Sequence, residues 1–335
     1  MRGGHHPAPS VGQVVRTVSM FEHHVGRRKS RAPYLVLGNG MLKRFNFVNA
    51  VSILSALARQ RRAAPFSYLS AAFDSLQVKN NLVLFYRDNN TVVKIFWELE
   101  DWARHLQGRT IAENAFQSLE IPSLIESSTA PLPWIEESLV SSGPPAIGLV
   151  QANLWEVVSD IFRLHNCCRS RSLLHLSGSE RTNFGRRAEM LKIEIPARVH
   201  RFLSAEQSRP AYKGFCHGDF SRGNMVGGGD SLVVIDWEKS GVDWVVRDLI
   251  KVFPEHPHLN REVFAAYASI ASREGPDAVA PADLHLEAAI FLAKRFATGH
   301  PSKKYFENRG TPEAYQPELE SVVHSITNHL VESSR

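Results

Sequence analysis

The chain has 335 residues, of which 43% are hydrophobic and 22% are charged, and it is long enough to form two lobes with a core in each. It contains no run of about 18 apolar residues, so no transmembrane helix is expected, and its three cysteines are too few for a disulfide framework. This cysteine usage favours a reducing, cytoplasmic setting. The net charge of +5 is uneven, because the first 73 residues carry eleven Lys or Arg against one acid, Glu22.

The first 72 residues are predicted to form two parts. Residues 1–31 indicate a basic, flexible arm, and 32–72 indicate an N-terminal extension. This extension would contain a hairpin around Asn39-Gly40 and then a helix. A basic arm of this kind suits a membrane surface, a nucleic acid or an anionic substrate, or it is simply solvated.

Residues 73–140 predict a small N-terminal lobe. Two apolar runs within 81–96 flank a polar turn, which is typical of a β-hairpin. A helix is expected from about 98 to 119, and it must end before Pro122 because the residue before a proline disfavours the helical region. The Pro- and Gly-containing stretch 129–148 is interpreted as the connection between lobes.

Residues 141–335 predict a larger C-terminal lobe. A β-rich segment, 214–237, interrupts a pattern that is otherwise mostly helical. The expected helices lie at 152–165, 186–204, 242–253, 261–273 and 282–297. A small β-rich part with one main helix, followed by a larger helical part, indicates an α+β fold with two lobes.

The segment 215–237, FCHGDFSRGNMVGGGDSLVVIDW, carries the residues that suggest chemistry. Two short strands with a glycine turn would bring Asn224 and Asp236 to the same end of a hairpin. An amide oxygen and a carboxylate there suit Mg²⁺, which prefers oxygen ligands. Asp219, on the loop just before, would accept the proton of an attacking hydroxyl and orient it for phosphoryl transfer.

A cation is also needed to hold a triphosphate. Lys94 lies between Val93 and Ile95 in the second strand of the predicted hairpin, where a half-buried lysine needs an anionic partner. Glu113, in the following helical stretch, is the favoured partner, and Glu98 and Glu100, which follow Lys94 closely, are the alternatives.

On these residues the chain resembles the aminoglycoside phosphotransferase and choline kinase superfamily, distant relatives of the protein kinases. The family pattern of His-Gly-Asp with Asn five residues after the Asp reads HGDFSRGN at 217–224, and IDWE follows at 235–238. The resemblance implies a bilobal protein-kinase-like fold, with residues 73–140 as the nucleotide-binding lobe and residues 141–335 as the catalytic and acceptor-binding lobe. It also implies ATP or GTP as phosphate donor, and Mg²⁺. Carried over by position, it makes Asp219 the catalytic base, Asn224 and Asp236 the Mg²⁺ ligands, Lys94 and Glu113 the nucleotide-binding pair, and Asp248 a brace for the catalytic loop.

The implied function is transfer of a γ-phosphoryl group to a hydroxyl of an aminosugar, amino alcohol or sugar-type acceptor. The net charge of residues 74–335 is −5 and favours a cationic acceptor, whereas the basic N-terminus favours an anionic one and also allows peripheral membrane contact. The alternatives are a kinase of a cell-envelope sugar and a catalytically weak regulatory scaffold. Nucleic acid is not favoured as the main partner, since no recognised reading motif is present.

The sequence also contains residue types typical of zinc sites. His165, Cys167, Cys168 and His175 have irregular spacing, and adjacent cysteines rarely bind one ion, so a metal site is not favoured there. Cys216, beside the HGD motif, is interpreted as a small buried side chain rather than a nucleophile.

Overall fold

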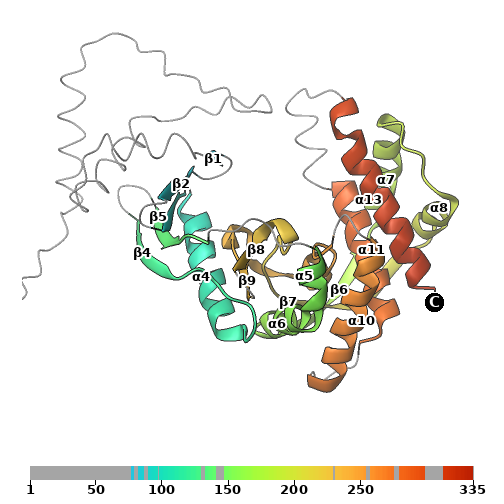
Figure 1. Cartoon of the computed structure of the whole chain (residues 1–335). Coiled ribbons are helices and arrows are strands. Elements are labelled where there is room, and N and C mark those ends of the chain that lie inside the picture. Colours follow the sequence, from blue (N-terminus) through green and yellow to red (C-terminus); the bar gives the residue numbers. More distant parts are fainter. Residues whose placement is uncertain are drawn as a thin grey trace, which may run out of the picture. The chain divides into compact units, whose positions relative to one another are not determined.

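The computed structural model describes residues 77–334, except for short gaps at 79–81, 87–89, 97, 130–132, 141–146, 229–230, 254–256, 275–278 and 299–311 (Figure 1). The chain divides into two compact units. The first comprises the residues up to 103 together with 122–141, and the second comprises 104–121 and 142–335. The predicted arm and extension, residues 1–72, lie outside the described residues.

The first unit contains a five-stranded antiparallel sheet with the strand order β1-β2-β3-β5-β4. The predicted hairpin is confirmed, because β2 pairs with β3 from Leu82 opposite Ile95 to Tyr86 opposite Thr91. Asn90 lies before β3 with φ 57°, a left-handed conformation that Asn tolerates better than most residues. The strands are β1 (Gln77–Val78), β2 (Leu82–Tyr86), β3 (Thr91–Ile95), β4 (Leu124–Ser128) and β5 (Trp134–Ser138).

One prediction for this unit is wrong in part. The stretch 129–148 was expected to be a connection, yet β5 lies within it and pairs with the central strand β3. Trp134 and Ile135 are buried in this strand. The flanking prolines indicated a loop, but pairing with a strand far earlier in the chain and burial of two large apolar side chains outweigh that local signal.

The second unit is mostly helical, as predicted. Helix α4 (Leu99–Ala115) belongs to this unit from Arg104 onward. Helix α7 begins at a capping box formed by Ser177 and Glu180. The other helices are α5 (Ile147–Ala152), α6 (Leu154–Asn166), α7 (Gly178–Met190), α8 (Ala197–Ser204), α9 (Val246–Leu249), α10 (Pro257–Glu274), α11 (Pro281–Thr298) and α13 (Pro312–Glu332).

Two of the predicted helices are corrected by the structure. The stretch 186–204 is interrupted between α7 and α8, where Lys192 has φ 54° and Pro196 precedes α8. The stretch 242–253 begins as a strand, β10 (Gly241–Trp244), before α9. In both cases apolar periodicity continues across a point where the backbone changes direction, so periodicity alone misses the break.

More β-structure is present than the segment 214–237 suggested. Strand β7 (Gln207–Cys216) begins earlier and pairs on one side with β10 and on the other with β6 (Ser170–Leu176). A separate two-stranded hairpin, β8 (Met225–Gly228) and β9 (Ser231–Val234), follows the predicted catalytic loop. These strands carry the site, and α6 and α11 pack against β6 and β7.

The core of the second unit is built from side chains on most of its helices and on the strands that carry the loop. Helix α6 alone buries Val157, Val158, Ile161, Phe162 and Leu164. Among the described residues, none of the helices combines the length and hydropathy needed to cross a bilayer.

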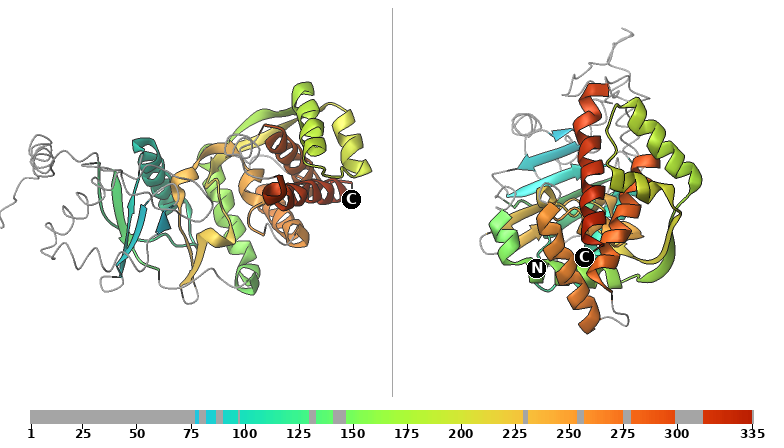
Figure 2. Two further views of the ribbon diagram at one scale, coloured as in Figure 1. Left: turned by 90° about the horizontal axis from the view of Figure 1, so that it is seen from above. Right: turned by 90° about the vertical axis from the view of Figure 1, so that its right-hand side faces the viewer.

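Helices α11 and α13 pack along each other in this unit (Figure 2), and a buried histidine pair joins them. The Nδ1 atoms of His285 and His329 lie 2.9 Å apart, and the ring of Phe264 stacks on His329 at 5.4 Å between centroids. One Nδ1 must donate and the other accept, so the accepting ring is neutral. Burial lowers the pKa of His285 to about 4 and that of His329 to about 3, so both rings are neutral at pH 7.

The fold is therefore expected to lose stability in mild acid. Because both pKa values in the folded state lie below the unfolded value near 6.5, the stabilisation is complete above that value and is lost as the pH falls toward 4 and 3. The loss should total roughly 2–4 kcal/mol in the free energy of unfolding. Glu332 opposes the shift at His285, and Arg261 adds to it.

Denaturant unfolding measured between pH 7 and pH 4 checks this prediction. The variant His329→Gln cannot be protonated and should show a flatter dependence, while His324→Gln, an exposed histidine on the same helix, should match the wild type. A pH dependence that is identical in all three proteins would contradict the assignment to this pair.

Candidate active site

The β8–β9 hairpin brings the predicted metal ligands to one end. Met225 pairs with Val234, and the carbonyl of Asn224 accepts the backbone N–H of Ile235 at 2.9 Å. Asn224 is thus beside the end of β9, and Asp236 is the next residue after that point. This is the hairpin geometry that the sequence predicted.

Asp236 has a left-handed backbone conformation, φ 73° and ψ 58°. A non-glycine residue adopts it at an energetic cost, and such residues are concentrated at functional sites. The turn is followed at once by Trp237, whose side chain is fully buried and packs edge-on against the ring of His217 at 4.5 Å between centroids. The strained turn at Asp236 therefore joins the end of β9 to the core beneath the loop.

His217 fastens the catalytic loop to the hairpin. Its Nε2 donates to the carbonyl of Ile235 at 2.9 Å, and its Nδ1 accepts the backbone N–H of Asp219 at 3.2 Å. A carbonyl can only accept and an amide can only donate, so the ring is neutral with its proton on Nε2. Burial lowers the pKa of His217, in agreement with this tautomer. His217 therefore links the backbone of Asp219 to the end of the hairpin through a neutral ring.

Asp248, on α9, braces the loop from below, as the resemblance implied. Its two carboxylate oxygens accept the backbone N–H groups of His217 at 2.7 Å and Gly218 at 2.8 Å. The side chain is fully buried, which would raise its pKa, but the hydrogen bonds with His165 and with the backbone N–H of Gly218 lower the pKa below its usual value. Asp248 is therefore an ionised carboxylate held entirely by the protein.

Gly218 has no acceptable substitute at its position. Its φ is +81°, and a Cβ there would lie 2.2 Å from the carbonyl oxygen of Lys239. Its own carbonyl accepts from Arg247 Nε and from Lys251 Nζ, each at 3.0 Å. The glycine thus allows the loop to pack directly against the segment that follows Asp236.

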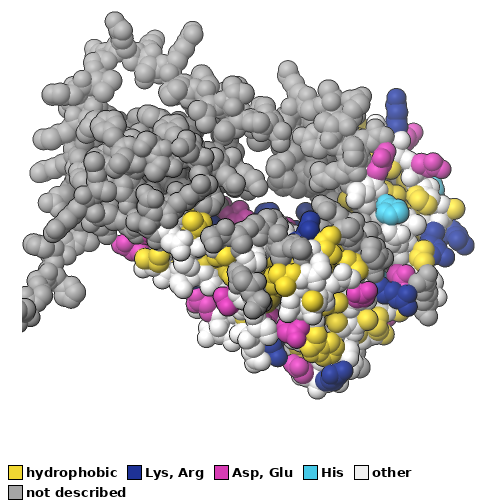
Figure 3. Space-filling view, viewed as in Figure 1, with side chains coloured by type: hydrophobic (Ala, Val, Ile, Leu, Met, Phe, Trp, Pro, Cys, Tyr) yellow, Lys and Arg dark blue, Asp and Glu magenta, His cyan; other side chains and the backbone are white. Residues whose placement is uncertain are grey.

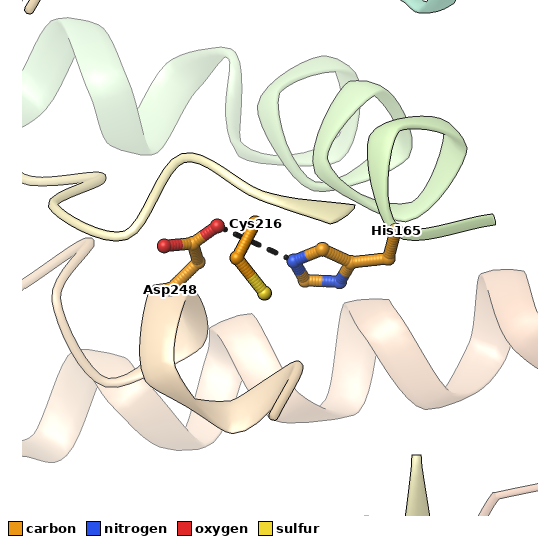
Figure 4. Close-up of side chains that lie close together, drawn as sticks. All are labelled: His165, Cys216 and Asp248. Atoms are coloured by element: carbon orange, nitrogen blue, oxygen red, sulfur yellow. Dashed lines mark hydrogen bonds and ion pairs between the residues drawn. The ribbon is translucent and has the colours of Figure 1, made fainter. Parts of the chain in front are cut away.

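His165, Cys216 and Asp248 form a buried trio under the loop (Figure 4). His165 Nε2 lies 3.4 Å from Asp248 Oδ2, while its Nδ1 is hydrogen-bonded to the hydroxyl of Tyr267 at 3.0 Å. Burial raises the pKa of the Cys216 thiol well above its ordinary value, so it remains protonated and is a poor metal ligand. Packing and the role of Asp248 in holding the loop explain why these three residues lie together. This agrees with the interpretation of Cys216 as a buried small side chain.

The carboxylate of Asp219 lies between two lysines. Lys251 Nζ donates to Oδ1 and Lys239 Nζ donates to Oδ2, each at 2.5 Å. Partial burial would raise the pKa of Asp219, but the hydrogen bonds and charges of the two lysines hold the pKa well below its usual range. Asp219 is therefore ionised, and a hydrogen bond from a lysine fixes the position of each carboxylate oxygen.

Neither lysine was predicted from the sequence. Lys239 follows directly after the IDWE segment, and Lys251 comes three residues after Asp248, so both are near recognised motifs. A lysine at either position does not by itself indicate a functional residue. Only the folding of η2 (Trp237–Lys239) and α9 against the loop brings the two side chains to Asp219.

Asn224 is oriented by the same loop. Its amide nitrogen donates to the carbonyl of Asp219 at 2.8 Å, which leaves the amide oxygen as its ligand atom. Asp236 directly follows Ile235, whose backbone N–H donates to the carbonyl of Asn224. Two hard oxygen donors at one end of a hairpin fit Mg²⁺, which binds few protein ligands and keeps water and phosphate oxygens for the rest.

Lys94 lies on β3 in the first unit and is 7% exposed. Its Nζ is 3.6 Å from Oε2 of Glu137, a residue of the neighbouring strand β5 that is itself buried. A buried lysine requires such a partner. Sequence reasoning missed Glu137, because the segment that contains it was interpreted as a connection and only the β3–β5 pairing reveals it.

Glu113 lies in the part of α4 that belongs to the second unit. Its Oε1 accepts from the buried guanidinium of Arg109 one turn earlier, at 2.7 Å, and the carboxylate side chain is 48% exposed. The structure therefore shows Glu137 beside Lys94 and Arg109 beside Glu113. The role of Glu113 toward Lys94 and a nucleotide stays a prediction.

With this geometry described, the chain can be compared with known proteins. Residues 172–282, which include the catalytic loop, the hairpin and Asp248, match the model of the phosphotransferase enzyme family. Comparison with curated proteins gives no significant match.

Solved structures of phosphotransferases are similar in fold. A GDP complex of an aminoglycoside 2′-phosphotransferase has a TM-score of 0.50 at 10% identity, covering 78% of this chain and 97% of that one. A choline/ethanolamine kinase family protein from Mesorhizobium loti has a TM-score of 0.49 at 16% identity, covering 84% and 99%. A ternary complex of another aminoglycoside phosphotransferase with streptomycin and ATP has a TM-score of 0.45 at 12% identity, covering 84% and 99%.

The match over residues 172–282 agrees with the predicted superfamily, and the similarity to the GDP complex confirms the predicted kinase-like α+β fold, with a small β-rich lobe and a larger, mostly helical one. The family match indicates an enzyme that transfers a phosphoryl group to an alcohol group.

Proposed function

We propose that this chain transfers the γ-phosphoryl group of ATP or GTP to a hydroxyl of a sugar-type small molecule in the cytoplasm, with Mg²⁺ as the metal ion. The observation that carries the proposal is the arrangement of Asp219, Asn224 and Asp236 around one loop and one hairpin end. Aminosugars and amino alcohols are the other acceptors that the resemblance suggests.

In this mechanism Asp219 orients the acceptor hydroxyl and accepts its proton as the new bond to phosphorus forms. A carboxylate with a depressed pKa is a weak base, which suits a reaction whose transition state is loose and whose catalysis rests mainly on positioning and charge. His217 and Asp248 hold the backbone of the loop, so Asp219 needs no rearrangement during the reaction.

Asn224 and Asp236 are the proposed Mg²⁺ ligands, and the bound ion would neutralise charge on the phosphate oxygens. Lys94 is the proposed cation for the triphosphate, with its orientation fixed by Glu137. Glu113 is retained as the second member of the proposed nucleotide-binding pair.

The variant Asp236→Asn tests the metal assignment. We expect phosphoryl transfer to fall by roughly 100-fold or more, because the variant lacks the charge that binds the cation. The Mg²⁺ concentration needed for half-maximal binding of a fluorescent ATP analogue should also rise. The control Asp283→Asn removes an exposed acid on α11 and should leave both values unchanged. An unchanged Mg²⁺ requirement in Asp236→Asn would remove this residue from the metal site.

A further inference from the structure

If the proposed function holds, the charges around Asp219 indicate the chemical class of the acceptor. On the described surface in Figure 3, basic, acidic and apolar side chains are interspersed. The charge that an acceptor meets is therefore set by the few residues next to the reacting group, and the net charge of the whole chain is a poor guide to it.

Two ammonium groups share the single carboxylate of Asp219. An ammonium carries three N–H donors. Lys251 uses two of them, on Asp219 and on the carbonyl of Gly218, and Lys239 uses one, on Asp219. Within the described residues, one donor of Lys251 and two of Lys239 thus remain for a ligand, and both nitrogens lie at the carboxylate that the acceptor hydroxyl must approach.

The neighbouring charges leave this cluster positive. Arg247 is paired with Asp243, and Asp248 is buried beneath the backbone and occupied by the N–H groups of the loop. Arg295 on α11 and Arg247 both repel the charge of Lys251, as the lowered pKa of that lysine reflects after the larger effect of burial. An amine on the acceptor would add another cation to this cluster, whereas an anion would bind to it.

We infer that the acceptor is a hydroxyl compound that carries a carboxylate or phosphate group close to the hydroxyl it offers, with Lys239 and Lys251 binding that anion. The pair then performs two tasks, holding Asp219 toward the hydroxyl and holding the acceptor by its charge. A cationic aminosugar or amino alcohol is disfavoured at this site, although the acid-rich composition of the larger part had suggested one.

Three probes with one carbon skeleton test the inference, namely gluconate, glucose and glucosamine. They carry a negative, a zero and a positive charge at neutral pH. With MgATP at saturation and low salt, gluconate should give a kcat/KM about tenfold or more above that of glucosamine, with glucose between them. The difference should shrink as NaCl is raised. Glycerol 3-phosphate against glycerol repeats the comparison for a phosphate group.

Binding is measured separately from transfer, through the rise in Tm that each probe causes without nucleotide. The variant Lys251→Gln should lose the stabilisation by gluconate and raise its KM about tenfold, with a smaller effect on glucose. Lys192→Gln, an exposed lysine after α7, is the matched control and should behave as the wild type.

The outcomes separate the two claims. Stabilisation by glucosamine equal to or above that by gluconate overturns the anionic acceptor, whether or not transfer occurs. An equal loss of kcat for every probe in Lys251→Gln, with KM unchanged, also overturns it, because the lysine would then act on the transferred phosphoryl group. Stabilisation by gluconate without any nucleotide-dependent transfer supports the anion site and contradicts the proposed function.

Discussion

Replacing Asp219 by Asn is expected to lower phosphoryl transfer by roughly 100- to 10,000-fold while leaving the fold intact. The amide has nearly the shape of the carboxylate but can neither accept a proton nor attract the ammonium groups of Lys239 and Lys251. The loop itself should remain in place, since His217 and Asp248 hold it through backbone atoms that the substitution does not change.

Initial rates with γ-labelled ATP and a hydroxyl acceptor measure this effect, and circular dichroism and Tm report the fold. Glu206→Gln, an exposed acid in the same unit, is the control and should retain full activity. Because the two lysines keep Asp219 ionised well below its usual pKa, its protonation should not produce an acid limb near pH 4 in the wild type. Turnover in Asp219→Asn within a few-fold of the wild type would exclude this residue as the base.

Replacing Asp248 by Asn is expected to reduce both stability and activity. One carboxylate oxygen becomes an N–H₂ group that faces a backbone N–H of the loop, so a buried donor is left without an acceptor. We expect a loss of roughly 2–4 kcal/mol in the free energy of unfolding. We also expect kcat per folded molecule to fall at least tenfold, because the backbone that aims Asp219 is no longer held.

Asp160 provides a matched comparison for this prediction. It is equally buried and accepts the backbone N–H groups of Gln117, Ser118 and Leu119, just after α4. Asp160→Asn should lower stability by a similar amount, yet leave kcat per folded molecule close to that of the wild type. If both variants lose stability alone and keep kcat at low temperature, Asp248 is a general structural residue and has no positioning role.

The central residues of the site could be predicted because they are close together in the sequence. Asp219, Asn224 and Asp236 lie on one loop and one two-stranded hairpin, so their spacing nearly determines their geometry. Asp248 follows shortly after, on a short helix that packs against the same loop. Local chain connectivity, rather than tertiary folding, limits how far apart these groups can lie.

The residues that were missed depend on contacts between distant segments. Glu137 is beside Lys94 only because β5 pairs with β3, and β5 itself was hidden by the prolines around it. The interruption between α7 and α8 and the start of β10 were missed for a related reason. Apolar periodicity records which positions are buried, and does not record where the backbone turns.

The sequence by itself predicted the superfamily, the two-part α+β organisation and the acid and amide groups of the proposed catalytic loop, because each is encoded in short motifs and local patterns. Tertiary structure alone decided which charges surround the catalytic carboxylate. Lys239 and Lys251 reach Asp219 because the loop, η2 and the segment after α9 fold against one another around Gly218 and Asp248. Electrostatic energy depends on the distance between charges in space, and that distance is set by packing rather than by position along the chain.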